Sequence, residues 1–400
     1  MERDADVIVV GAGASGLSLA YRLCTPPPGR PLPRVTLIDA PPGPLRPPER
    51  TWCFWESGPG DYDGALGASW ASLRVRGRDG TETVGRPGPF RYKMLRSGSF
   101  EALVAERLDG TGAPARVAAR VDTIRDLPGD AGAEVTGVRA DGSPLTLRGR
   151  WVFDSRPPRV LPPARTTLLQ HFRGWFVRTE RPVFDPGTAD LMDFRTPQPP
   201  RGLSFGYVLP TGAREALVEY TEFSREVLND AGYERALRNY TGRVLGLGDF
   251  EVTASEQGVI PMTDGRFARR AGRSVFRIGT AGGATRPSTG YTFAAVQRQT
   301  RAVAAAYHAG RVPAPPPAYG ARATAMDAVL LRGLDSGRVD GAAFFEGLFR
   351  RVPTERLLRF LDGDTRPYED VLIGLRTPVR PMLRTVAELP WLRRRPPGGT

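Results

Sequence analysis

Residues 6–16 have the sequence Asp-Val-Ile-Val-Val-Gly-Ala-Gly-Ala-Ser-Gly. The β-branched run before the first glycine suits a buried parallel strand, and residues 17–23 predict a helix directly after the last glycine. A turn between a strand and a helix exposes free backbone N–H groups at the positive end of the helix, where phosphate binds. This arrangement predicts a βα unit that binds a dinucleotide.

The GxGxxG spacing gives each glycine of this turn a physical role. Gly11 makes the turn, Gly13 lets the backbone approach a pyrophosphate, and Gly16 lets the helix pack closely on the strand. A second predicted strand ends in Asp39, about 20 positions after the helix start, where a carboxylate accepts hydrogen bonds from ribose hydroxyls. The acidic residue disfavours the 2′-phosphate of NADP, which leaves FAD or NAD. The cofactor-binding residues predicted in this half are Gly11, Gly13, Ala14, Gly16 and Asp39.

A second loop of small residues, Gly-Thr-Ala-Gly-Gly-Ala-Thr-Arg-Pro-Ser-Thr-Gly-Tyr-Thr-Phe, occupies positions 279–293 between a predicted strand and a predicted helix. Alone, this loop is also consistent with a tight turn. Together with the amino-terminal turn, it predicts the second half of a nucleotide site. We expect it to contribute Gly279, Gly282, Gly283, Ser288 and Gly290 to cofactor binding.

Asp154 follows a further apolar run, Trp151 to Phe153, that predicts a central strand. Ligands of open α/β sheets gather at the carboxyl ends of the strands, so we predict that Asp154 lies near the cofactor. An aspartate that caps the strand explains the same pattern equally well.

The composition predicts a globular protein of about two domains, with 400 residues, 40% hydrophobic and 25% charged. The net charge of +13 comes from arginine, because Lys93 is the only lysine among 56 basic residues. The arginines are scattered and no nucleic-acid-binding signature accompanies them, so we expect no nucleic-acid partner. A diffuse positive charge neither proves nor excludes contact with anionic lipid.

Several other sites and segments are not expected. Cys24 and Cys53 are the only cysteines, and no spacing pairs them, which suits a reduced, cytoplasmic interior. No Cys, His and carboxylate spacing predicts a metal site, and no GxSxG elbow predicts a serine nucleophile. The polar amino terminus does not resemble a signal peptide, and no apolar run of about 18 residues predicts a spanning helix.

An aromatic cluster, Arg-Thr-Trp-Cys-Phe-Trp-Glu at positions 50–56, follows a proline-rich linker. It is either a plug of the core or a wall of the cavity beside the cofactor, and the segment alone favours neither. The pair Asp79-Gly80 then predicts a hairpin within residues 70–83.

An antiparallel sheet inserted into the nucleotide-binding fold is predicted from the aromatic and β-branched segments 168–179, 202–209 and 215–223. With the period of a strand, Glu219 shares a face with Leu217 and Thr221. A carboxylate in such company is either on the solvated side of the sheet or a desolvated acid with a raised pKa. The pattern alone favours the solvated side.

Helices are predicted at residues 100–108, 225–245, 324–334, 341–349, 354–361 and 368–375. The last four form a carboxyl-terminal part, and their apolar spacing indicates a face that is buried or contacts an apolar partner. Residues 391–395, Trp-Leu-Arg-Arg-Arg, suit either an interfacial anchor or a frayed basic end, and we expect the frayed end.

Taken together, several strings resemble the lycopene cyclase family of flavoproteins, in particular its bacterial β-cyclase branch. Besides the two glycine-rich turns, they are RTWCFW at 50–55, LLQHFRGWF at 168–176, LMDFR at 191–195, YVLP at 207–210, LVEYT at 217–221 and IPM at 260–262. The resemblance implies an α/β fold like those of flavin hydroxylases and geranylgeranyl reductases. It implies a discontinuous Rossmann-like FAD domain (1–60, 91–165 and 258–310), an antiparallel substrate domain (61–90 and 166–257) and a helical part (311–400).

The resemblance also implies an activity, the closure of the ψ-end groups of lycopene to β-ionone rings. The reaction is redox-neutral but needs reduced FAD, with NADPH as the expected electron source. The family's essential acid lies in a motif that reads Glu-Glu-Thr or Glu-Asp-Thr elsewhere and Glu219-Tyr220-Thr221 here. Glu219 matches the first acid, whereas Tyr220 replaces the second. This departure leaves open whether a second acid is needed, and Glu222 and Asp193 are the candidates to supply one. The expected catalytic residues are Glu219 and Asp193.

The chemistry of a hydrocarbon substrate favours the same acid. Cyclisation needs a proton at C2, and an apolar tunnel that raises a carboxyl pKa lets Glu219 hold that proton near neutral pH. This argument reverses the preference for the solvated side, and it makes Trp52, Phe54 and Trp55 candidate walls for a developing cation. The flavin N5 region is the alternative donor, so the assignment of donor and acceptor stays open. The alternatives on this scaffold are a monooxygenase or halogenase, a prenyl reductase, and a non-catalytic carrier. A water-insoluble substrate further predicts peripheral attachment to the inner face of a membrane.

Overall fold

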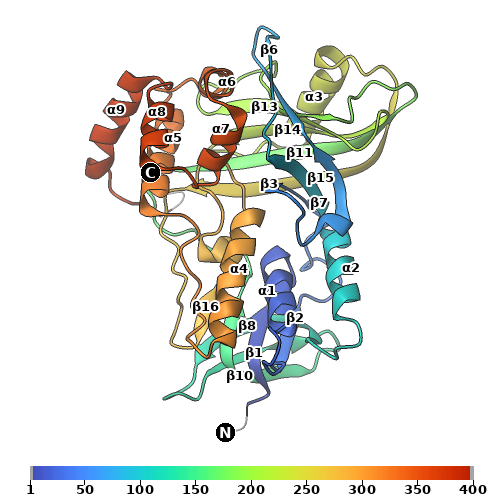
Figure 1. Ribbon diagram of the computed structural model, residues 1–400, viewed down its shortest axis with the longest axis vertical. Helices are drawn as coiled ribbons and strands as arrows, with labels where there is room; N and C mark the ends of the chain where they lie inside the picture. The colour runs from blue at the N-terminus through green and yellow to red at the C-terminus, as the bar shows by residue number, and fades with distance from the viewer. Residues whose placement is uncertain (1–2, 397–400) are drawn as a thin grey trace.

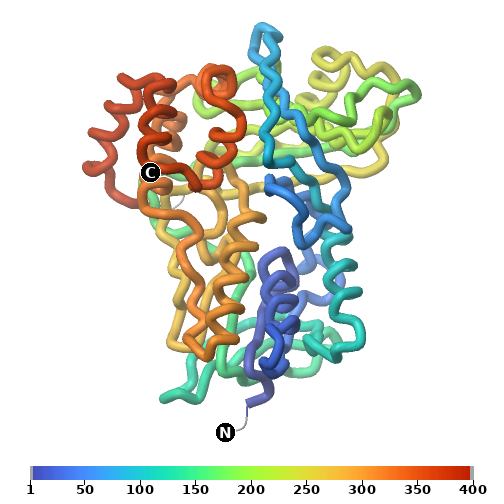
Figure 2. The backbone as a smooth tube through the Cα atoms, viewed as in Figure 1, coloured from blue at the N-terminus to red at the C-terminus, as the bar shows by residue number. Residues whose placement is uncertain are grey.

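The computed structural model describes residues 3–396. Two large sheets occupy opposite halves of the molecule, and the carboxyl-terminal helices lie beside the second sheet (Figure 1). Figure 2 shows that the chain returns near residue 300 to the half that holds the amino-terminal strand. The glycine-rich loop at 279–290, far from the amino terminus in sequence, therefore belongs to the same half as the GxGxxG turn.

The first half is built on a six-stranded sheet. Its strands are β1 (Ala5–Val10), β2 (Val35–Asp39), β8 (Ala115–Asp126), β9 (Ala133–Arg139), β10 (Pro144–Asp154) and β16 (Val275–Arg277). β2, β1, the end of β10 and β16 run parallel in that order, with the start of β8 parallel to β2. The rest of β8, β9 and the start of β10 form an antiparallel meander. The parallel strands are buried as their continuous apolar runs predict.

Three long helices accompany this sheet: α1 (Ala14–Cys24), α2 (Ser97–Leu108) and α4 (Phe293–His308). In α1, Leu19, Ala20 and Leu23 are buried together with Phe293 and Val303 of α4 in one apolar cluster. This packing brings the two glycine-rich turns, which lead into α1 and α4, to the same end of the sheet.

The second half is a seven-stranded sheet, whose strands come from the chain between β10 and β16 except for two that come from an earlier segment. Its order is β15 (Phe250–Thr263), β11 (Thr167–Thr179), β14 (Glu215–Ser224), β13 (Leu203–Pro210), β12 (Thr188–Asp193), β5 (Ser72–Arg76) and β6 (Glu82–Gly85). All neighbouring pairs are antiparallel except β12 and β5. β5 and β6 form the hairpin that the Asp79-Gly80 turn predicts.

A small three-stranded sheet lies at the junction of the halves, with the order β3 (Thr51–Ser57), β7 (Phe90–Arg96) and β4 (Leu66–Trp70). Its strand β3 carries the aromatic cluster and divides it between two faces. Trp52 stacks on Phe293 and Phe54 lies 4.7 Å from the same ring, so both belong to the core of the first half. Trp55 instead meets Tyr291 edge-on at 4.7 Å.

The remaining helices are α3 (Asp230–Asn239), α5 (Ala321–Asp335), α6 (Gly341–Arg351), α7 (Thr354–Leu361), α8 (Pro367–Gly374) and α9 (Val379–Glu388), with short turns η1 (Asp63–Ala65), η2 (Tyr240–Val244), η3 (Gly279–Gly282) and η4 (Leu389–Trp391). α3 begins five residues later than the pattern suggests because Asn229 caps it. The sequence prediction missed α9, which carries Pro381 inside its first turn. Buried residues of α5, α6 and α7 share one apolar cluster with the seven-stranded sheet.

The carboxyl-terminal residues that the structure describes are held rather than frayed, which corrects the expectation for residues 391–395. The backbone of Arg395 pairs with Ala164 in both directions, at 2.9 and 2.8 Å. The guanidinium of Arg394 lies 3.3 Å from the buried carboxylate of Asp264. These contacts anchor the segment while Trp391 stays 85% exposed.

The strand pairings bear on the predicted domain boundaries without fixing them. β4, within the range 61–90, pairs with β7 rather than with the seven-stranded sheet. β15 continues without a break across residue 258 and stays paired with β11 up to Thr263. The boundaries given above remain a prediction.

Candidate functional site

The GxGxxG turn has the geometry of a phosphate cradle. Gly13 is the N-cap residue of α1 and no side chain caps the helix, so its first N–H groups are unclaimed by a cap. A Cβ atom at Gly13 would meet nothing within 4 Å, whereas one at Gly16 would collide with the carbonyl oxygen of Gly11. The turn is therefore tight where helix and strand meet and open where a pyrophosphate would approach.

The second loop lies directly against this turn. A Cβ atom at Gly279 would collide with Oγ of Ser15, so the structure brings Gly279 together with the predicted residues of the first half. Gly282 packs against the backbone of Arg277, and Gly283 is the left-handed C-cap of η3. These contacts shape the loop next to the open space at Gly13.

The two acidic residues at the carboxyl ends of strands differ in what they can still bind. Asp39 is hydrogen-bonded by the N–H of Ala40 at 2.8 Å, and Arg46 is 3.8 Å away. Its side chain remains 30% exposed, which leaves room for a ribose. Both oxygens of Asp154, in contrast, are bound by Arg156 at 2.9 Å. For Asp154 the geometry favours the capping interpretation.

Ser288 and Gly290 connect the loop to the second half of the molecule. The hydroxyl of Ser288 donates to Oδ1 of buried Asp327 in α5 at 2.7 Å, which links the loop to the carboxyl-terminal helices. Gly290 has a φ of +72° and lies so close to the side-chain oxygen of Gln170 in β11 that a Cβ atom would collide with it. The next residue, Tyr291, thereby reaches the face of the seven-stranded sheet that carries Tyr207 and Glu219. We call this the inner face.

A row of side chains crosses this inner face from β13 to β15. Tyr207 is the register partner of Glu219, Glu219 is the partner of Gly174, and Gly174 is the partner of Glu256. Directly paired residues project their side chains to the same side of a sheet. Two carboxyl groups therefore face the same space with a glycine between them.

Glu219 is the acid of this row whose titration is most altered. Burial raises its pKa to about 8, the nearby charge of Glu256 adds to the rise, and a hydrogen bond from Thr221 Oγ1 at 2.5 Å opposes it. A carboxyl with this pKa is mostly protonated at neutral pH. The structure thus supports the desolvated acid for Glu219 rather than the solvated one.

Glu256 was missed by the sequence interpretation. It lies on the edge strand β15, and its Oε2 accepts a hydrogen bond from Thr51 Oγ1 of β3 at 2.7 Å. Burial raises its pKa, while Thr51 and the charge of Arg96 oppose the rise. The only sequence signal was its position three residues before the segment Val259-Ile260-Pro261, and no local pattern predicts which residue faces Glu219 across a third strand.

Tyrosine hydroxyl groups and a thiol close the space on the side of the small sheet. The hydroxyl of Tyr291 lies 3.0 Å from that of Tyr92 and 3.2 Å from that of Tyr207, and the last two are also hydrogen-bonded to each other. Burial raises the pKa of Cys53, and the charges of Glu219 and Glu256 add to the effect. Hydroxyl groups, a thiol and aromatic rings thus line this side of the acid.

Asp193 and Glu222, the other acids expected to contribute, lie on the opposite face of the sheet. Asp193 belongs to the row of Gly206 and Tyr220. Its oxygens accept hydrogen bonds from Arg195 at 2.9 Å and from Tyr240 at 3.0 Å. Glu222 accepts from Tyr220 at 3.0 Å and lies 3.8 Å from buried His171. The structure does not bring either acid together with Glu219.

The aromatic cluster serves both purposes that the sequence left open. Trp52 and Phe54 plug the core, as described above, whereas Cys53 and Trp55 face the tyrosine cluster together with Thr51. Trp55 is thus the one of the three proposed cation-stabilising aromatic residues that lies on the side of Glu219.

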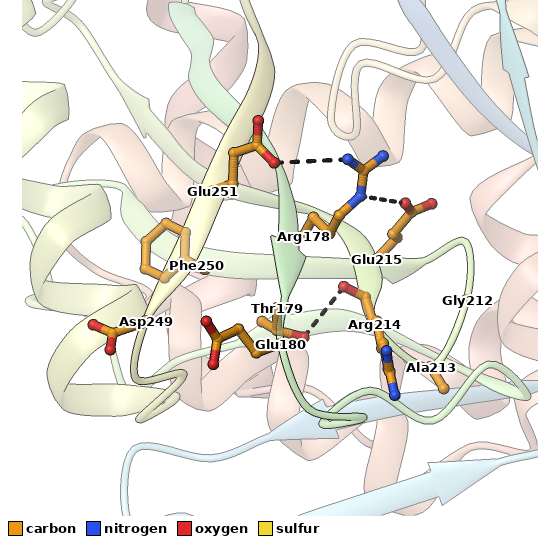
Figure 3. Close-up of a pocket in the computed structure, with 10 residues that line it drawn as sticks. All are labelled: Arg178, Thr179, Glu180, Gly212, Ala213, Arg214, Glu215, Asp249, Phe250 and Glu251. Carbon is orange, nitrogen blue, oxygen red and sulfur yellow. Dashed lines mark hydrogen bonds and ion pairs between the residues drawn. The ribbon is translucent and has the colours of Figure 1, made fainter.

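A separate hollow lies at the surface of the seven-stranded sheet. It is an open depression of about 900 Å³ at the end of β11, lined by residues 178–180, 212–215 and 249–251. Figure 3 shows Arg178 between Glu215 and Glu251, at 2.8 and 3.6 Å, so its charges are mutually paired. A shallow, charged surface of this kind does not suit a hydrophobic substrate. Within residues 3–396, no cluster of three or more His, Cys, Asp or Glu side chains has the geometry of a metal site.

Comparisons with known proteins bear on the family and the fold of the chain. The family model described as lycopene cyclase protein matches residues 6–387. Among curated proteins, the search finds no significant match.

Similar solved structures include a flavoprotein/dehydrogenase from Cytophaga hutchinsonii, with 12% identity over 96% of this chain and 99% of that chain and a TM-score of 0.64. A p-nitrophenol 4-monooxygenase from Pseudomonas putida has 16% identity over 99% and 100% of the two chains and a TM-score of 0.59. A geranylgeranyl bacteriochlorophyll reductase-like protein from Thermoplasma acidophilum has 13% identity over 97% and 99% and a TM-score of 0.58. At these identities the likeness concerns the fold alone, and it confirms the predicted fold class.

Proposed function

Because the chain belongs to the lycopene cyclase family, we propose that it is a lycopene β-cyclase that closes ψ-end groups to β-ionone rings and yields γ-carotene and β-carotene. The observation that carries this proposal is the position of Glu219. Its carboxyl, with a pKa of about 8, lies among tyrosines and aromatic rings. These residues lie where the second half of the molecule meets the first half, which holds the GxGxxG turn. An acid that is protonated at neutral pH is what the protonation of an alkene requires.

The first step is the transfer of the Glu219 proton to C2 of the terminal alkene. The cation left at C1 is attacked by the C5–C6 double bond, which forms the C1–C6 bond and moves the positive charge to C5. Loss of the proton at C6 then gives the β-ring double bond. Substrate and product are isomers, so the reaction needs no net electron transfer.

The surroundings of Glu219 assist the charged intermediates. Trp55 and the rings of Phe172 and Phe176 on the inner face of β11 offer π-electron density to a carbocation. The desolvation that raises the pKa of Glu219 also keeps water from capturing the cation. Thr221 holds the orientation of the carboxyl through its hydrogen bond.

We propose FAD as the cofactor, held by the open turn at Gly13, by Asp39 and by the loop that begins at Gly279. When bound and reduced, FAD would supply negative charge to balance the cationic intermediates, with NADPH as the proposed electron source. The start of α1 suits a pyrophosphate because no side chain caps the helix and the space at Gly13 is open. A further support is that one of the similar structures is described as a flavoprotein.

Expression in cells that accumulate lycopene tests the reaction. We expect pigments with unchanged mass and one or two β-rings, identified by chromatography and mass spectrometry, and none from the Glu219→Gln variant. A product heavier by one oxygen atom would establish a monooxygenase instead, and one heavier by two hydrogens a prenyl reductase. Bound FAD without turnover would indicate a carrier.

We further propose that the enzyme works at the cytoplasmic face of a membrane and binds it through α8, α9 and η4. These elements carry a concentration of exposed apolar side chains: Val371, Leu372, Leu375, Leu383, Val386 and Trp391. Arg376, Arg380, Arg384 and Arg393 are exposed among them and suit anionic headgroups. None of the helices that the structure describes is long and apolar enough to span a bilayer.

Flotation with vesicles that contain anionic lipid tests this attachment. The wild type should float at low salt, and the double variant Leu375→Glu, Leu383→Glu should not, because charged residues in the apolar face oppose insertion. A wild type that stays at the bottom of the gradient would refute the attachment without touching the cyclase proposal.

A further inference from the structure

We propose that Glu256 is the partner of Glu219 in the reaction, the base that accepts the proton lost from C6. This inference rests on the proposed cyclase activity and assigns its second proton transfer to a residue that the sequence did not suggest. The geometry that carries it is the row in which Glu219 and Glu256 flank Gly174 on one face of the sheet.

The spacing suits two groups that act on opposite sides of one small ring. β14 and β15 are the two neighbours of β11, so the backbones of Glu219 and Glu256 are about 10 Å apart. A Cβ atom at Gly174 would lie 2.7 Å from Leu217 Cδ1 and 3.4 Å from Glu219 Cβ. The glycine thus leaves the space between the two carboxyl groups free of a side chain of its own.

Contacts from the small sheet differ between the two acids. Glu256 receives the hydrogen bond of Thr51, which favours its carboxylate form. Arg96, at the end of β7, adds a positive charge nearby, and its guanidinium stacks on the ring of Phe176 at 4.5 Å. Glu219 accepts a hydrogen bond from the hydroxyl of Thr221, and the negative charge of Glu256 raises its pKa. Pairs whose surroundings separate their affinities for a proton are suited to act as acid and base.

The steps balance without any further reactant. Glu219 gives its proton to C2 and becomes a carboxylate, and the electron pair of the C5–C6 double bond forms the C1–C6 bond. The C6–H bond then breaks, its electron pair forms the new C5–C6 double bond, and its proton goes to Glu256. One proton transfer from Glu256 back to Glu219 restores the starting state, and nothing is oxidised or reduced.

The other buried acids are unsuited to this role because basic side chains already bind them. Asp193 is bound by Arg195, Asp190 by Arg74 and Arg76, Asp327 by Arg286, and Glu134 by Arg125 and Arg148. Glu256 has no such ion pair within 4 Å among residues 3–396. It is therefore a half-buried acid that faces Glu219 and has no basic partner within ion-pair distance among the described residues.

The decisive variant is Glu256→Gln, which keeps the shape but cannot accept a proton. In lycopene-accumulating cells we expect its cyclisation rate to fall by about 10²-fold or more. We expect the residual product to shift from β-rings to isomers formed by proton loss from C4 or from the methyl group on C5, a change that a merely structural role would not cause. Glu256→Asp should retain β-rings at a reduced rate.

Glu251→Gln is the matched control, since Glu251 lies on the same strand but is exposed and ion-paired at the surface. It should behave like the wild type. An active wild type together with a Glu256→Gln variant of unchanged rate and pure β-ring product would overturn the inference. A wild type that forms no ring would overturn the proposed function and the inference with it.

A second readout does not depend on turnover. Infrared titration of the protonated carboxyl band, assigned with Glu219→Gln, reports the pKa of Glu219 in the folded protein. Removal of the negative charge at position 256 should lower that pKa, and an unchanged pKa would show that the two groups do not interact. The other titratable or charged groups that face the pair, and that stay the same in both proteins, are Glu49, Cys53, Tyr92, Arg96, Tyr207 and Tyr291.

Discussion

The two faces of the seven-stranded sheet differ in what packs against a glycine and in what binds the neighbouring acid. On the face covered by α3 and η2, the ring of Tyr240 fills the space above Gly206, and Asp193 of the same row is bound by Arg195. On the inner face, the neighbouring row places Gly174 between Glu219 and Glu256, and the atoms nearest to a Cβ at Gly174 belong to Leu217 and Glu219. Gly206 admits an aromatic ring of the protein, and Gly174 admits the end of Leu217 and places no side chain of its own between two acids.

This contrast separates structural acids from reactive ones. Asp193 is fully buried, and arginine side chains compensate its charge. Glu219 is half-buried and has no such partner among residues 3–396, so its neutral form is the more stable one and desolvation raises its pKa to about 8. A protein tolerates an uncompensated acid of this kind where chemistry needs a proton.

The largest effect is expected from Glu219→Gln. The amide keeps the shape and the polarity of the neutral acid but has no proton to give, so cyclisation should fall by about 10³-fold or more. Pigment formation per folded protein measures the loss, with the content of bound FAD as the control for folding. A variant that retains a tenth of the wild-type rate would show that another group starts the reaction.

On the opposite face, Asp193→Asn should act on stability. The substitution leaves Arg195 without its buried partner and removes one of the two buried carboxylates beside Arg76, which keeps Asp190; the loss costs about 3 kcal/mol in the free energy of unfolding. Urea denaturation of wild type and variant measures the difference. Equal stability of the two proteins would mean that the ion pairs of this face do not hold it together, and the contrast between the faces would disappear.

The pH dependence of stability distinguishes the same two acids. Since the pKa of Glu219 is raised to about 8, its neutral form stabilises the fold fully below pH 4.5, and this contribution is lost as the pH rises to 8. Each pH unit in that window costs at most about 1.4 kcal/mol. Relative to the wild type, Glu219→Gln should therefore gain stability between pH 4.5 and 8, measured by denaturation at several pH values. A constant difference would refute the raised pKa.

Gly174→Ala probes the space between the acids. Gly174 has ordinary strand geometry, and alanine is the better strand residue by about 0.5–1 kcal/mol, which offsets the pressure on the flexible end of Leu217. We expect little change in stability but a loss of cyclisation on the order of 10²-fold, because the methyl group displaces the reacting ring. Full activity of this variant would show that the substrate does not occupy the space above Gly174.

The contrast between the faces also explains what the sequence could and could not predict. The strand, turn and helix around Gly11 to Gly16 are local, so composition and spacing were sufficient to predict them. Glu219 was found through its motif. Glu256 faces it only through the pairing of β15 with β11, and that register is set by contacts far apart in sequence. Asp193 lies after an irregularity in the pairing of β12, which no local period reveals.

The smallest effect that still bears on this comparison is expected from Thr51→Val. Valine has the shape of threonine but cannot donate from its side chain, so Glu256 loses the hydrogen bond of the Thr51 hydroxyl. A hydrogen bond to a charged group is worth about 1.5 kcal/mol, and a less stable carboxylate is less often ready to accept a proton, so cyclisation should fall about tenfold. The loss should shrink as the pH is raised, because higher pH restores the ionised form of Glu256, and rates measured from neutral to alkaline pH check this. A tenfold loss that stays constant with pH would mean that Thr51 only positions β3, and the inner face would then hold one reactive acid instead of two.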